Sequence, residues 1–250
     1  MMRMLPILLF LTAAGCSKDP SPVEVAQTHV KSWQSMGMCL PEAQVPFFAA
    51  NFTEVANVLT DALCHPDNAV RQRAAYIIEG IGDVASPLEP DLVRAIKVES
   101  VRVVRLYLYA ALRAIGSRQP GTVEMLKNKF EALTKRPIAA TDGVTYTATD
   151  ERIYLSSAIY CLTSDEAEKS KYISEVTQWL VPPAAGLSES ERDAYWEHRW
   201  CAVNSVKHMK GAQEALPLLE AMLTEEAPKP WVSIHVPEAI VSLQNEDDLR

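Results

Sequence analysis

Three side chains able to bind a metal or act as nucleophiles lie close together, on a stretch that we expect to be helical. His198 and Cys201 are three residues apart, and His208 follows Cys201 by seven. These spacings place all three on one helix face. A zinc site needs three or four ligands with supporting hydrogen bonds. Because three groups along one helix spread over about 15 Å, we expect polar surface residues here and no metal site.

Other pairs of reactive side chains give no stronger indication of catalysis. Cys64 and His65 are adjacent, and adjacent helical residues point in different directions. Residues 225–226 and 247–248 are neighbouring carboxylates, whereas an acid–base pair must converge across a cleft. The sequence also lacks the glycine-rich, P-loop, Gly-x-Ser-x-Gly and His-Glu-x-x-His motifs. We therefore expect no catalytic residue, no cofactor and no enzyme activity.

The first sixteen residues have the layout of a secretory signal. Arg3 precedes an apolar run from Met4 to Ala14, and small residues follow before Cys16. This order is typical of a signal peptide. The run is too short for a transmembrane helix, which needs about 20 apolar residues. A plain cleaved signal and an uncleaved anchor are the simpler interpretations.

The sequence Ala-Ala-Gly-Cys at residues 13–16 resembles the lipobox of bacterial lipoproteins, with alanine in place of the usual leucine. The resemblance implies a signal peptide at 1–15 and a lipidated Cys16 followed by a tether, together spanning 16–22. The residue after the cysteine is Ser17, where some lipoproteins have aspartate. In this position it resembles the residues of lipoproteins that are sorted to the outer membrane. We therefore expect an acylated chain in the bacterial cell envelope, anchored in the outer membrane and facing the periplasm.

The rest of the chain contains an internal repeat. Residues 68–82 and 102–116 align at an offset of 34, with Val-Arg near the start and Ile-Gly at the end. Three weaker copies follow, and the five copies share a reference position, occupied by Arg71, Arg105, Arg152, Arg199 and Ser233. The residues three, six, seven and ten places later are mostly apolar or small. This spacing forms one stripe of an α-helix.

Other amphipathic stretches separate these helices, and we expect each to be the first helix of an antiparallel pair. They span residues 53–64, 88–98, 121–134, 166–180 and 212–224. The alternating pattern of a strand occurs only at 143–147, inside an insertion at 135–149 that lengthens one repeat. A second insertion lies at 182–191.

The Val-Arg, Ala-Ala and Ile-Gly pattern resembles HEAT or HEAT-like repeats over residues 45–246. The resemblance implies an all-α fold, a right-handed α-solenoid of about five antiparallel helix pairs. Residues 23–250 would form this domain, with 23–44 as its N-terminal cap. An irregular all-α bundle is the alternative.

The same resemblance gives the reference arginines a role in stacking. In the family, such an arginine pairs with an acidic group of the neighbouring repeat, and Asp67 is a further candidate acid within a loop. The residues concerned are Arg71, Arg105, Arg152 and Arg199.

Four cysteines follow Cys16, and an even number in an exported chain allows two disulfides. A loop can bring Cys39 back to Cys64 at a helix end, so this pairing and two free thiols both stay open. The repeat register separates Cys161 from Cys201 by about 10 Å along the axis, beyond the reach of a disulfide, about 7 Å between α-carbons. Pairing them requires a shift of register.

One face of the second helices is rich in aromatic residues. In a solenoid these helices line the concave face, where tyrosine and tryptophan are favoured anchors for a partner. We expect the partner-binding residues to be Tyr76, Tyr107, Tyr154, Trp196, Trp200 and His235. Packing against the next repeat is the alternative role of these residues.

The balance of 24 basic against 32 acidic residues, a net charge of −8, argues against a nucleic-acid partner. We therefore expect a lipid-anchored scaffold that binds an unidentified protein or peptide on its concave face. One alternative is a structural subunit or assembly factor of an envelope complex. Another is a HEAT-like lyase, which a pocket joining His198, Cys201 and His208 would favour.

Overall fold

The computed structural model describes residues 19–37, 39–117, 119–135, 147–183, 185–225 and 229–245. Within these ranges every regular element is a helix, which confirms the all-α class. The expected signal segment, Cys16 and the strand-like residues 143–146 lie outside the described residues.

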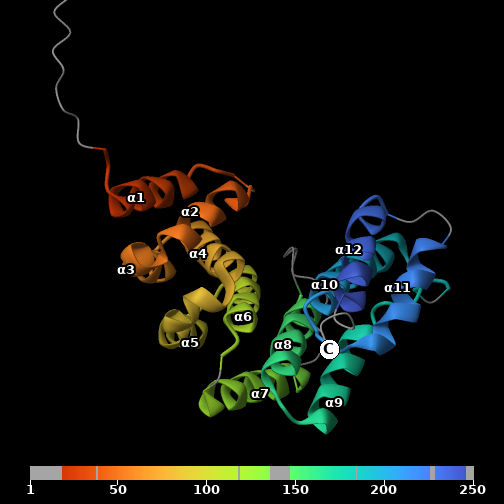
Figure 1. Cartoon of the computed structure of the whole chain (residues 1–250). Coiled ribbons are helices and arrows are strands. Elements are labelled where there is room, and N and C mark those ends of the chain that lie inside the picture. Colours follow the sequence, from red (N-terminus) through yellow and green to blue (C-terminus); the bar gives the residue numbers. More distant parts are fainter. Residues whose placement is uncertain are drawn as a thin grey trace, which may run out of the picture.

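Two rows of helices form the body of the protein (Figure 1). The inner row runs along the inside of a curve: α4 (Asn68–Ile81), α6 (Arg102–Ile115), α8 (Ala148–Leu162), α10 (Glu189–Val206) and α12 (Val232–Gln244). The outer row consists of α3 (Phe52–Leu63), α5 (Glu89–Val98), α7 (Pro120–Thr134), α9 (Glu166–Thr177) and α11 (Leu216–Leu223). Consecutive inner helices contact one another, so the rows follow the chain order.

The N-terminal end is closed by α1 (Pro22–Trp33) and the short α2 (Val45–Ala50). Short 3-10 turns precede α2, α5 and α11, spanning Glu42–Gln44, Gly82–Leu88 and Gln213–Ala215. Trp33 is fully buried, and its indole donates to Gln44 at 2.8 Å. The segment expected to cap the repeats therefore packs onto α3 and α4 as part of the same core.

The apolar stripe of the inner helices forms the core, as its spacing predicted. In α4 and α6 all eight stripe positions are buried, from Ala74 to Ile115. In α8 and α12 the stripe is buried apart from Leu162 and Ile240, which are half-buried. Each buried Leu or Ile stabilises the fold by roughly 1.5–3 kcal/mol, so the stripe holds the two rows together.

Each reference arginine forms an ion pair with a glutamate further along the chain. The pairs are Arg71–Glu99 at 2.7 Å, Arg105–Glu151 at 2.5 Å, Arg152–Glu175 at 2.5 Å and Arg199–Glu225 at 2.6 Å. Burial alone would raise the pKa of Glu99, but hydrogen bonds from Arg71 and the Val101 N–H hold it below its usual value. Asp67 instead caps α4, accepting from the Ala69 N–H at 2.8 Å.

The four cysteines in the described part of the chain form no disulfide. Cys39 and Cys64 are exposed free thiols, so the disulfide considered for them is not formed in this structure. Cys161 is half-buried and Cys201 buried, and neither is in a disulfide. In the part of the chain that the structure describes, no helix has the length and apolar character to span a bilayer.

Candidate functional site

The aromatic residues expected on the inner face are half-buried and divide into separate groups. Tyr76 of α4 and Tyr107 of α6 meet edge to face, with ring centroids 6.2 Å apart. Trp196 packs on Trp231 at 6.0 Å, and the Arg199 guanidinium lies 4.7 Å from the Trp196 ring centre.

The other members of the expected aromatic surface have mixed environments. Tyr154 and Trp200 pack partly against the core, and His235 lies 3.2 Å from Glu238 on its own helix. The neighbouring apolar positions Leu106 and Ile153 are buried, so they pack between helices rather than face a partner. Tyr76 and Tyr107 are the two expected residues that the structure brings together on adjacent inner helices.

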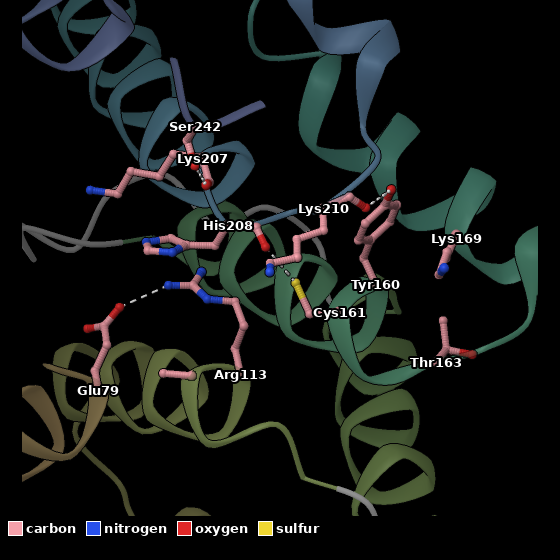
Figure 2. Close-up of a pocket in the computed structure, with 11 residues that line it drawn as sticks. Glu79, Arg113, Tyr160, Cys161, Thr163, Lys169, Lys207, His208, Lys210 and Ser242 are labelled. Atoms are coloured by element: carbon pink, nitrogen blue, oxygen red, sulfur yellow. Dashed lines mark hydrogen bonds and ion pairs between the residues drawn. The ribbon is translucent and has the colours of Figure 1, made fainter. Parts of the chain in front are cut away.

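A pocket of about 510 Å³ lies one helical turn further along the same face (Figure 2). The residue eight places after the reference position lines the pocket in four repeats. Glu79, Arg113 and Tyr160 come from α4, α6 and α8, and Lys207 directly follows α10. Ser242 extends the lining to α12, and Lys169 of α9 adds an outer-row residue. Elements far apart in the sequence therefore share one cavity, which has the volume typical of a ligand site.

One wall of the pocket is the loop that follows α10, and three side chains hold its carbonyl groups. Ser242 donates to the carbonyl of Lys207 at 2.6 Å, and Tyr160 donates to that of Lys210 at 2.9 Å. The Cys161 thiol lies 3.1 Å from the carbonyl of His208. The loop then turns at Gly211, whose φ of 79° favours glycine. These contacts fix the backbone from which two lysines extend.

The pocket is rich in positive charge. Arg113, Lys169, Lys207 and Lys210 line it, against one carboxylate from Glu79. The Arg113 side chain is only 4% exposed; it donates to Glu79 at 2.9 Å and to Ser157 at 3.0 Å. Its Nε has no hydrogen-bond partner.

His208 lies beside these cations, with its imidazole facing Arg113 (Figure 2). The surrounding protein, followed by the positive charges of Arg113 and Lys207, holds the pKa of His208 well below its usual value. His208 is an exposed residue, and its lowered pKa keeps the imidazole neutral at pH 7.

His198 and Cys201 were expected at the surface, but both are buried, in a separate polar cluster. His198 Nδ1 lies 2.7 Å from the Asp150 carboxylate, which also accepts from the Thr147 N–H at the start of α8. Burial, followed by the Asp150 charge, raises the pKa of Cys201, so its thiol stays protonated.

The pocket contains His208 but neither His198 nor Cys201, so the structure does not join these three residues. No group of three potential metal ligands occurs among the described residues.

The pocket lies on the same row of helices as the expected partner-binding residues, but about one turn further along each helix. The expected residues other than Trp196 lie one, two or five places after the reference positions, whereas the pocket residues on the inner row lie eight or nine places after them. A usable signal was present, because residues one, five and eight lie on one helix face. At the eighth position the repeats carry polar or amphipathic residues: Glu79, Arg113, Tyr160 and Lys207.

Comparison of the chain with protein-family models, with curated proteins and with solved structures finds no match.

Proposed function

We propose that the chain is a non-catalytic recognition scaffold, held at the bacterial envelope by a lipid on Cys16, that binds a protein or peptide on its inner face. In this proposal the two rows of helices are a right-handed HEAT-like solenoid of about five helix pairs. One observation carries it: residues from α4, α6, α8, α12 and the loop that follows α10 converge on one cavity of about 510 Å³.

The inner face has the properties that recognition needs. Half-buried Tyr76 and Tyr107 offer ring edges beside a polar pocket, and aromatic anchors next to polar groups are favoured in interfaces. The ion pairs Arg71–Glu99 and Arg105–Glu151 fix neighbouring units, so the face is formed before binding.

The lyase alternative gains no support, because the pocket lacks two of the three residues that would favour it. A structural role in a larger complex would use an apolar patch elsewhere. The large apolar side chains that are exposed lie on several different helices and turns: Val84, Val98, Val181, Leu223, Ile234 and Val241. Recognition on the inner face is therefore preferred.

Site-specific photo-crosslinking in intact cells tests the proposal. A photoreactive amino acid is placed at Tyr76 on the inner row or at Lys97, an exposed residue of α5 in the outer row. We expect a discrete protein adduct from Tyr76 and none from Lys97. Adducts from Lys97 alone, or from neither position, would contradict recognition on the inner face.

A further inference from the structure

We propose that the pocket binds an anionic group whose oxygens are those of a carboxylate or a phosphate, held by Lys207, Lys210 and Arg113. This goes beyond the proposed function, because a free small anion would occupy the pocket whether or not a protein partner binds.

The distribution of charge is the first support. The chain carries an excess of eight negative charges, yet four of the five formally charged side chains lining this pocket are cationic. Gathering cations in a partly enclosed cavity costs free energy through mutual repulsion and loss of water. A bound anion offsets that cost, as in clefts that focus one sign of charge onto a substrate.

Two of the four cations lack an acidic partner. Arg113 pairs with Glu79 at 2.9 Å, and Lys169 pairs with Glu166 at 2.8 Å. For Lys207 and Lys210, the described residues provide no carboxylate within ion-pair distance. Their ammonium groups are therefore available to a ligand.

The backbone that carries both lysines is fixed in advance. Ser242 holds the carbonyl of Lys207 and Tyr160 holds that of Lys210, so an anion need not order the loop when it binds. These two hydroxyls come from α12 and α8, elements on opposite sides of the loop in sequence. The pocket is thus a built site rather than two lysines on an open surface.

Arg113 adds a buried charge to the floor of the pocket. Its guanidinium has one carboxylate partner and a Nε without any hydrogen bond, so its donors are not all satisfied. Burial, followed by the positive charges of Arg113 and Lys207, lowers the pKa of His208 beside it. The volume of about 510 Å³ accommodates a multivalent anion such as a tricarboxylate or a diphosphate.

Calorimetric titration of the full chain with citrate, pyrophosphate and a capped octaglutamate peptide, at constant low ionic strength, tests the proposal. The variant Lys207→Gln/Lys210→Gln removes the two unpaired charges. The matched control Lys31→Gln/Lys97→Gln removes the same charge from exposed sites on α1 and α5.

We expect at least one probe to bind wild type, with Kd weakened about tenfold or more in the pocket variant and changed less than about twofold in the control. Tighter binding of the peptide than of citrate assigns the anion to acidic side chains of a partner. The reverse assigns it to a small free anion.

A second measurement on the wild-type protein keeps the proposal falsifiable if the pocket variant fails to fold. NMR titration of His208 should show its pKa rise when citrate or pyrophosphate saturates the protein, because the anion neutralises the neighbouring cations. No binding of any probe, equal loss of affinity in both variants, or an unchanged pKa of His208 at saturation would each overturn the proposal.

Discussion

At the scale of single residues, the four reference arginines make similar ion pairs in different surroundings. The Arg71 side chain is 17% exposed, whereas that of Arg199 is fully buried. Arg199 makes a bidentate pair with Glu225, at 2.6 and 2.7 Å, and also donates to the carbonyl of Leu180 at 2.8 Å. A buried ion pair adds little stability compared with apolar residues in its place. Removing only one partner is costly, because it leaves an unpaired charge in the protein.

Replacing Arg199 with alanine should therefore lower the free energy of unfolding by about 3–5 kcal/mol, since Glu225 loses its partner and a cavity forms under Trp196. Urea denaturation followed by circular dichroism measures the change. Lys171→Ala breaks the exposed Lys171–Glu131 pair and should cost less than about 1 kcal/mol. Equal losses in the two variants would show that burial does not set the effect.

The lowered pKa of His208 predicts how the stability of the protein depends on pH. Its pKa is lowered in the folded protein by the surrounding protein and by Arg113 and Lys207, whereas in the unfolded chain it returns to about 6.5. Above that pH the imidazole is neutral in both the folded and the unfolded state, so it does not make stability depend on pH. Below it, the unfolded chain gains a proton that the folded protein does not, so stability falls as the pH falls from 7 to 5.

Since His208 is partly exposed, the slope should be smaller than the full value of about 1.4 kcal/mol per pH unit. Urea denaturation of wild type and His208→Asn at pH 5, 6 and 7 checks this. The variant should lose less stability over that range than wild type, and identical slopes would contradict the prediction.

At the scale of elements, the sequence predicted the inner helices more accurately than it predicted the helices at the N-terminal end. The stripe beginning at Ala74 predicted α4, and its counterpart predicted α6, because repeated apolar positions at helical spacing leave no other regular structure. The short α2 was not predicted, since Val45–Ala50 has no counterpart in the later repeats. Its position against α4 depends instead on one glycine.

Gly80 lies where α4 passes closest to α2. A β-carbon at this position would lie 2.8 and 2.9 Å from the two γ-methyl carbons of Val45. Gly80→Ala should therefore lower the unfolding free energy by about 1–3 kcal/mol through overpacking, despite the better helix propensity of alanine.

Gly121 in the first turn of α7 provides a matched control, because no heavy atom would lie within 4 Å of its added β-carbon. Gly121→Ala should leave stability unchanged or raise it by up to about 1 kcal/mol. Thermal or urea denaturation of both variants makes the comparison. A destabilised Gly121→Ala, or a stabilised Gly80→Ala, would contradict the close approach of α2 and α4.

At the scale of the whole molecule, the pocket shows what local patterns do not contain. The repeat register predicted which residues share a helix face, but Glu79 and Ser242 share a cavity only because the row of inner helices is curved. No short segment of the sequence encodes this curvature. Cys161 is a second example. The repeat register predicted that it lies apart from Cys201, but it did not predict the contact of its thiol with the carbonyl of His208.

Attachment to a membrane is also a property of the whole chain. In our proposal the protein is attached to the membrane through acylation of Cys16. Cys16→Ser should move the protein from the membrane fraction to the soluble fraction and abolish incorporation of labelled palmitate. Its far-UV circular dichroism should not change, because the first described helix begins at Pro22 and the core lies beyond it.

Cys39→Ser and Cys64→Ser supply the controls for that experiment. Both residues are exposed free thiols, and serine is close to cysteine in size, so neither change should alter the fold or the fraction in which the protein is found. Release of either control from the membrane would show that the thiols of the domain contribute to attachment. Retention of Cys16→Ser in the membrane fraction would instead place the anchor in the uncleaved apolar segment from Met4 to Ala14.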